Sequence, residues 1–111
     1  ANGSVAVYGQ KVVAAADGVV IYSNSTNSWG GGYGYYIMID HGTDSKGRRI
    51  VTLYAHNSRV YAKVGDKVVG GQTVISLAGD TGNVTGPHLH FEVRVDGTAV
   101  DPIANGYVKV K

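Results

Sequence analysis

The sequence contains no cysteine, only 2 prolines and a single methionine. The absence of cysteine excludes a disulfide scaffold, a thiol nucleophile and a thiolate-bound metal. No apolar run approaches the ~20 residues that a membrane-spanning helix requires. Charged residues make up only 16% of the 111 positions, and the net charge is +2. Because Arg48 and Arg49 are the only adjacent basic pair, this small excess gives no argument for a nucleic-acid partner.

The residues that are abundant favour strands over helices. The chain has 17 glycines and 8 tyrosines, and valine rather than leucine dominates its aliphatic residues. No segment keeps a helical apolar period for three turns, whereas short β-rich runs alternate with turn residues such as Asp17-Gly18 and Gly70-Gly71. The sequence therefore predicts a single all-β domain over residues 1–111, with little or no helix.

The turn residues divide this domain into eight predicted strands. Two connections are longer than the others: residues 24–33 predict a mobile, glycine-rich loop, and residues 42–48 predict a hairpin tip. The tail after Asp101-Pro102 predicts a loosely packed end. The predicted strands cover residues 11–15, 18–23, 34–40, 49–56, 59–62, 67–69, 73–78 and 88–95.

The candidate chemistry lies in the four histidines, and two of them share the last predicted strand. Side chains alternate between the faces of a strand, so one face of 88–95 is apolar and the other is polar. The predicted polar face carries His88, His90, Glu92 and Arg94. Two imidazoles presented together can supply one metal ligand and one acid–base group.

A third candidate, His56, ends the predicted strand 49–56. Alternation predicts that His56 shares a face with Thr52 and Tyr54, while the residues between them point inward. We interpret His41 as a hydrogen-bonded or surface residue. We interpret Asp17 as the turn residue of an Asp-Gly pair.

The segment GDTGNVTGPHLHFEVR (79–94) closely resembles the signature of the lysostaphin/LytM-type zinc metallopeptidases. Three further segments match that family in the expected order, at residues 12–20, 53–56 and 64–72, so the resemblance covers residues 9–103. It implies a compact antiparallel β sandwich or half-barrel with one zinc ion in a groove. It also implies hydrolysis of peptide cross-links or stems in bacterial peptidoglycan, and thus a location outside the cytoplasm.

The resemblance also implies roles for individual residues. His90, the second histidine of the H-x-H pair, is the expected zinc ligand, while His88 and His56 are expected to act on the water and the tetrahedral intermediate. Three protein ligands leave zinc an open position whose water loses a proton near neutral pH. Tyr33 and Tyr35 are candidates for the wall of the substrate groove.

The chain departs from the family pattern before residue 12. The family's other two zinc ligands belong to an H-x-x-x-D motif, whereas residues 1–9 read ANGSVAVYG and contain neither histidine nor aspartate. Either the motif lies upstream in a parent protein or the domain has lost it. The retained His56, His88 and His90 favour the first explanation. The start at Ala1, without methionine, leads us to expect a processed product or a fragment.

Two other classes of function compete with an active peptidase. Degenerate domains of this family bind cell wall or activate partner wall enzymes, which makes a non-catalytic docking module the main alternative. A carrier domain of the biotinyl or lipoyl kind shares the G-D-x-V-x-x-G-Q pattern. Such a carrier presents a modified lysine on a hairpin, commonly between methionines, and the single Met38 has no adjacent lysine.

Overall fold

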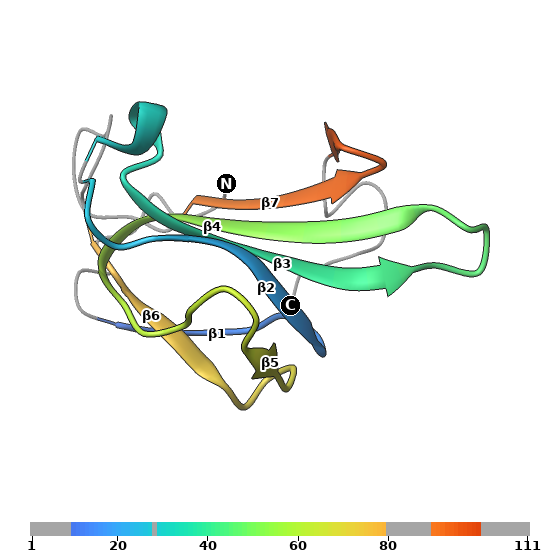
Figure 1. The fold of residues 1–111 in the computed structure, drawn as a ribbon, viewed down its shortest axis with the longest axis horizontal. Coiled ribbons are helices and arrows are strands. Elements are labelled where there is room, and N and C mark those ends of the chain that lie inside the picture. The colour runs from blue at the N-terminus through green and yellow to red at the C-terminus, as the bar shows by residue number, and fades with distance from the viewer. Residues whose placement is uncertain (1–9, 28, 80–89, 101–111) are drawn as a thin grey trace.

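The computed structural model describes residues 10–27, 29–79 and 90–100, and their regular structure is almost entirely β-strand (Figure 1). A single 3-10 turn, η1 (Gly30–Gly32), interrupts the strands. None of the helical structure in these ranges has the length and hydropathy to cross a bilayer. The strands are β1 (Lys11–Val13), β2 (Gly18–Asn24), β3 (Tyr35–Thr43), β4 (Arg49–Val60), β5 (Lys67–Val68), β6 (Val74–Ala78), β7 (His90–Val95) and β8 (Thr98–Val100).

The strands form one curled antiparallel sheet in which β4 is the central element. The order is β1-β6-β4-β3-β2-β5, and β7 pairs with both β4 and β8. One edge of β4 pairs with β3. Along its other edge, residues 50–55 pair with β7 and residues 57–60 pair with β6. The predicted half-barrel with little helix is confirmed, and β4 holds its two layers together.

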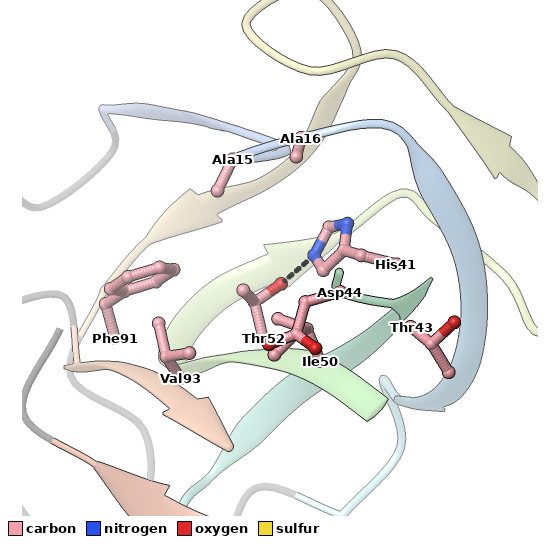
Figure 2. A pocket seen from close by; sticks show the side chains of 9 residues that line it. All are labelled: Ala15, Ala16, His41, Thr43, Asp44, Ile50, Thr52, Phe91 and Val93. Carbon is pink, nitrogen blue, oxygen red and sulfur yellow. Dashed lines mark hydrogen bonds between the residues drawn. The ribbon is translucent and has the colours of Figure 1, made fainter. Parts of the chain in front are cut away.

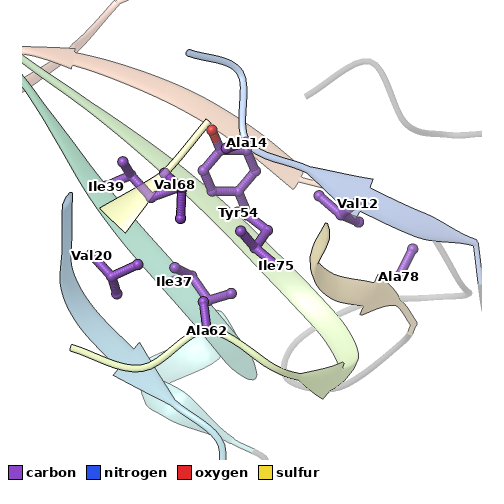
Figure 3. Packing of buried hydrophobic residues seen from close by; sticks show 10 residues of the cluster. All are labelled: Val12, Ala14, Val20, Ile37, Ile39, Tyr54, Ala62, Val68, Ile75 and Ala78. Carbon is purple, nitrogen blue, oxygen red and sulfur yellow. The ribbon is translucent and has the colours of Figure 1, made fainter. Parts of the chain in front are cut away.

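The hydrophobic core lies on one face of the β3–β4–β7 layer (Figure 3). Across this layer Tyr54 is paired with Ile37 of β3 and with Phe91 of β7, so these side chains share the core face. Strands β1 and β6 close the core from the other side through Val12 and Ile75. The buried cluster consists of Val12, Ala14, Val20, Ile37, Ile39, Tyr54, Ala62, Val68, Ile75 and Ala78.

The predicted facing of β4 is wrong in one respect. Thr52 and Tyr54, which were expected beside His56, are 4% and 2% exposed and belong to the core face. Leu53, expected to point inward with the core, is instead the cross-strand partner of Glu92 on the opposite face. The reason is that residues 51–57 are all buried, so apolar alternation does not distinguish the faces of a central strand.

Several predicted boundaries also change. Residues 49–56 and 59–62 were predicted as two strands, but 49–60 form the continuous β4. The hairpin tip is shorter than predicted, because β3 extends to Thr43 and Asp44 accepts hydrogen bonds from the backbone N–H groups of Lys46 and Arg48. Strand β8 was not predicted. The predicted tail after Asp101-Pro102 lies outside the described residues.

A chain of hydrogen bonds crosses the core face at His41, beside a cavity of about 250 Å³ (Figure 2). The imidazole Nδ1 lies 2.7 Å from the carbonyl oxygen of Asp17, and Nε2 lies 2.7 Å from Oγ1 of Thr52. The Thr52 hydroxyl donates to the Tyr54 hydroxyl at 2.8 Å. The Tyr54 hydroxyl oxygen also accepts the Ala15 N–H at 2.9 Å. His41 is therefore a hydrogen-bonded structural residue, as predicted.

This chain makes the buried hydroxyl of Tyr54 important for stability. The change Tyr54→Phe leaves the Ala15 N–H and the Thr52 hydroxyl without their acceptor, so we expect a loss of about 1–3 kcal/mol in the free energy of unfolding. Urea denaturation followed by circular dichroism measures this loss. Tyr61→Phe, at a tyrosine that is 47% exposed, is the matched control and should stay within about 0.5 kcal/mol of the parent chain. Equal effects of the two changes would contradict the analysis.

Candidate active site

The structure brings two of the predicted site histidines together on the face opposite the core. The ring centroids of His56 and His90 lie 5.8 Å apart, in an edge-to-face arrangement of 65°. The pairing of β4 with β7 places them there, because His90 lies directly across from Ala55, the neighbour of His56. The third candidate, His88, lies outside the described residues, so its role stays a prediction.

His56 reaches this face because β4 contains a bulge. Tyr54 of β4 pairs with Ile37 of β3, and Asn57 pairs with Tyr35. Two residues of β4 lie between its paired positions but only one residue of β3 does, so β4 contains one extra residue. That extra residue adopts a left-handed conformation, with φ of 60° at His56. Regular alternation would turn its side chain toward the core with Tyr54, and the bulge turns it toward His90 instead.

The backbone of the bulge is held by two neighbouring residues. The N–H of His56 donates to the carbonyl oxygen of Tyr33 at 2.7 Å. Asn57 is fully buried, and its Nδ2 donates to the carbonyl oxygens of Tyr35 and Tyr54 at 2.8 and 2.9 Å. Its Oδ1 accepts the Ser76 hydroxyl at 2.8 Å. Asn57 thus connects β3, β4 and β6 at the position that follows His56.

His90 is held by a second set of contacts, from its own strand. Oε2 of Glu92 lies 2.6 Å from Nε2 of His90. The other oxygen, Oε1, accepts Nε–H of Arg94 at 3.1 Å, and the Arg94 Nη2 donates to the Tyr33 hydroxyl at 3.1 Å. The face predicted for His90, Glu92 and Arg94 is therefore confirmed for these three residues.

These contacts shift the pKa values of the groups around His90. Burial alone would raise the pKa of Glu92, but hydrogen bonds from His90 and Arg94 outweigh it and hold that pKa below its ordinary value. Burial, followed by the nearby Glu92 carboxylate, raises the pKa of Tyr33. Glu92 is thus an anion and Tyr33 a neutral phenol at neutral pH.

Aromatic rings continue from His90 across the same face. The Tyr33 ring lies 6.0 Å from the His90 ring and 5.3 Å from Tyr36, which stacks on Tyr22 at 4.8 Å. Burial, followed by the Tyr22 hydroxyl, raises the pKa of Tyr36 to about 12. Tyr35 is the first residue of β3 and lies on the alternate side of the strand from Tyr36. A substrate contact of Tyr33 or Tyr35 stays a prediction.

The loop that carries Tyr33 is held by two asparagines. Asn24 Nδ2 donates to the carbonyl oxygens of Asn27 and Gly34 at 2.7 and 3.0 Å. Asn27 Oδ1 accepts the N–H groups of Trp29 and Gly30 at 3.1 and 3.2 Å. The segment predicted as a mobile loop therefore contains η1 and an ordered set of hydrogen bonds that fixes where Tyr33 leaves it.

The described residues fit a zinc ion only in part. Among the described residues the hydrogen bond of the His90 ring is made by Nε2, to Glu92, and an imidazole whose second nitrogen can bind a metal is a normal zinc ligand. Within residues 10–27, 29–79 and 90–100, however, no three histidine, cysteine, aspartate or glutamate side chains converge on one point. A zinc site with His90 therefore needs donor groups from outside these ranges.

The chain belongs to peptidase family M23, whose family model matches residues 4–102. This match confirms the family that the sequence motifs indicated.

Two curated relatives illustrate the range of proteins that carry such a domain. The DD-carboxypeptidase/endopeptidase Mpg of Neisseria meningitidis is 41% identical over 96 residues, which cover 86% of this chain and 20% of that protein. The murein hydrolase activator EnvC of Escherichia coli is 39% identical over 94 residues, which cover 85% of this chain and 20% of that protein. The chain spans about a fifth of the length of these relatives.

Solved structures show the same fold. A zinc-containing peptidase from Vibrio cholerae is 38% identical with a TM-score of 0.71, over 85% of this chain and 26% of that one. The catalytic domain of lysostaphin from Staphylococcus simulans is 32% identical with a TM-score of 0.72, over 91% of this chain and 73% of that domain. The half-barrel of this chain is thus the lysostaphin-type fold.

The sequence analysis did not identify the residues that hold the two histidines in place. Alternation had placed Glu92 and Arg94 beside His90, but it gave no hydrogen bond between them. Tyr33 was only a candidate for the wall of the substrate groove, and Asn57 was not among the candidate site residues. Residue spacing carries no information on the bulge, which depends on pairing between distant strands.

Because the backbone at His56 is left-handed, we expect the usual order of stability of glycine and alanine to be reversed at this position. Glycine inside a strand is ordinarily about 0.5–1 kcal/mol less stabilising than alanine. At position 56 alanine must adopt positive φ, which costs about 1–2 kcal/mol, whereas glycine adopts it freely. We expect His56→Gly to be more stable than His56→Ala in thermal and urea unfolding.

The control for this pair lies three residues further along the same strand. Arg59 is exposed on β4, where the backbone is not left-handed, so Arg59→Gly should be less stable than Arg59→Ala. If alanine is the more stable residue at both positions, the proposed bulge geometry is wrong.

Proposed function

We propose that this chain is the zinc-dependent endopeptidase domain of a protein that hydrolyses peptide bonds in the stems or cross-bridges of bacterial peptidoglycan. The observation that carries the proposal is the meeting of His56 and His90 on one face, in a chain of family M23. The name of another relative supports the substrate, because ShyA of Vibrio cholerae is a peptidoglycan DD-endopeptidase. A peptidoglycan substrate places the domain outside the cytoplasm.

In this proposal the histidines divide the work. His90 would hold the metal, and a bound zinc ion would polarise the scissile carbonyl and lower the pKa of the attacking water. His56 and His88 take the proton of that water and stabilise the tetrahedral intermediate. One of them returns a proton to the leaving amine as the C–N bond breaks. The His56 and His90 rings lie 5.8 Å apart, so His56 would be close to a metal held by His90.

The incomplete donor set determines what we expect of the 111-residue chain itself. In this proposal its described residues supply one of the three protein ligands that catalytic zinc normally has, and the sequence of residues 1–9 contains neither histidine nor aspartate. We expect the chain alone to bind zinc weakly and to release no peptidoglycan fragments. A version extended at its N-terminus by an H-x-x-x-D segment should bind one zinc ion and become active.

A second candidate function is supported by the activator relative. EnvC is named a murein hydrolase activator, and its match covers 85% of this chain. A domain that keeps the fold with an incomplete donor set could likewise dock on a partner wall enzyme. In that case neither the chain nor its extended version would cleave peptidoglycan, and either would increase the rate of the partner.

Digestion of purified sacculi tests the proposal, with released fragments identified by mass spectrometry. In the extended version, His56→Ala and His88→Ala should keep zinc and lose about 10²–10⁴-fold in rate, as expected for acid–base groups. His90→Ala should lose zinc, measured by metal analysis after dialysis. His41→Gln is the matched control, since His41 lies on the core face, and its rate should be unchanged.

Two outcomes would contradict the endopeptidase proposal. One is full activity of the His90→Ala variant. The other is a zinc-loaded extended version that releases no fragments but accelerates a murein hydrolase, which would establish the activator function instead.

A further inference from the structure

Both site histidines are held by the same residue, Tyr33. Its carbonyl oxygen accepts the His56 N–H at 2.7 Å, so it holds the bulge that turns His56 toward His90. Its hydroxyl accepts Nη2–H of Arg94 at 3.1 Å. Arg94 in turn donates to Glu92, whose other oxygen contacts His90 at 2.6 Å. One residue therefore contacts the backbone of one histidine and, through two side chains, the ring of the other.

We propose that Tyr33, Arg94 and Glu92, named here the Tyr33 network, position the two site histidines relative to each other and fix the tautomer of His90. In this proposal Tyr33 is a positioning residue and not a wall of the substrate groove. The catalytic meaning of the network rests on the proposed function, whereas its geometry does not.

The tautomer follows from the chemistry of a carboxylate. An ionised carboxylate only accepts hydrogen bonds, so the contact with Glu92 Oε2 requires a proton on Nε2 of His90. In a neutral imidazole the lone pair available to a metal is then on Nδ1. Carboxylates placed behind ligating histidines in this way fix ring orientation and raise ligand basicity.

Arg94 gives this arrangement its rigidity. It bonds Oε1 of Glu92 and so leaves Oε2 directed at His90, and its second donor is anchored on the Tyr33 hydroxyl. All three side chains of His90, Glu92 and Arg94 are between 14% and 27% exposed, which limits competition from water. Without the Tyr33 hydroxyl, Arg94 loses its hydrogen bond to the loop before β3.

The backbone of Tyr33 is fixed on both sides. Its N–H donates to the Gly30 carbonyl oxygen at 3.3 Å, and the N–H of Gly34 donates to the Trp29 carbonyl oxygen at 2.8 Å. Asn24 Nδ2 also holds the Gly34 carbonyl oxygen. The carbonyl group that holds His56 is therefore part of a rigid turn, and substitution of the Tyr33 side chain by phenylalanine leaves it in place.

The first test uses the metal-free 111-residue chain and needs no activity. Nitrogen-15 NMR of labelled histidines should show His90 protonated on Nε2, with that proton protected from exchange with water. Tyr33→Phe should increase its exchange rate about 3–10-fold, the effect of losing one hydrogen bond in the network. Glu92→Ala should remove the protection entirely. Tyr36→Phe deletes the same atom from the neighbouring ring and should change nothing.

The second test uses the extended, zinc-binding version and separates positioning from substrate contact. Tyr33→Phe should lower kcat and leave KM within about twofold, and Glu92→Ala should weaken zinc binding about 10–100-fold. A Tyr33 that lines the substrate groove would raise KM instead. If Glu92→Ala fails to fold, Tyr33→Phe, which removes a single oxygen, carries the test alone.

The two tests distinguish failure of this inference from failure of the proposed function. Equal proton exchange in Tyr33→Phe, Tyr36→Phe and the parent chain overturns the network, whatever the activity. A protected Nε2 proton in a chain whose extended version cleaves nothing supports the network and contradicts the endopeptidase function.

Discussion

The structure depends on the double pairing of β4. This strand pairs with β3 along one edge and with both β7 and β6 along the other, and its residues 51–57 are all buried. The extra residue in this strand, His56, is placed where the edge partner changes from β7 to β6. A left-handed histidine costs about 1–3 kcal/mol and persists only where its surroundings hold it. Here Tyr33 and Asn57 do so, and the strain places an imidazole where regular alternation would not.

The two faces of the same layer use histidine differently. On the core face both nitrogens of His41 have partners, the Asp17 carbonyl oxygen and the Thr52 hydroxyl, so its ring has a structural role. On the other face Nε2 of His90 is held by Glu92, and in the proposed function Nδ1 would bind the metal. The residue type alone does not separate these roles. What distinguishes the two roles is whether both ring nitrogens of the histidine have hydrogen-bond partners within the described residues.

The sequence predicted most of the fold and part of the site. Strand positions, the absence of long helices and the face shared by His90, Glu92 and Arg94 all follow from turn residues and alternation, which are local. The orientation of His56 does not, because a bulge results from pairing between β3 and β4. The position of Tyr33 was missed for the same reason, since its partners lie 23 and 61 positions away along the chain. Contacts between distant segments decide how the site is held.

The supports of His90 bear on the choice between a catalytic and a docking domain. A module that only docks on a partner has no need to fix which nitrogen of a histidine carries the proton. In this chain an anion, a guanidinium and a phenol, all partly buried, are arranged behind that one imidazole. Burying charged groups is costly unless each is paired, and the pairing found here also fixes the orientation of the His90 ring. Orientation matters for a metal ligand, so the Tyr33 network supports the proposal that the domain binds a metal.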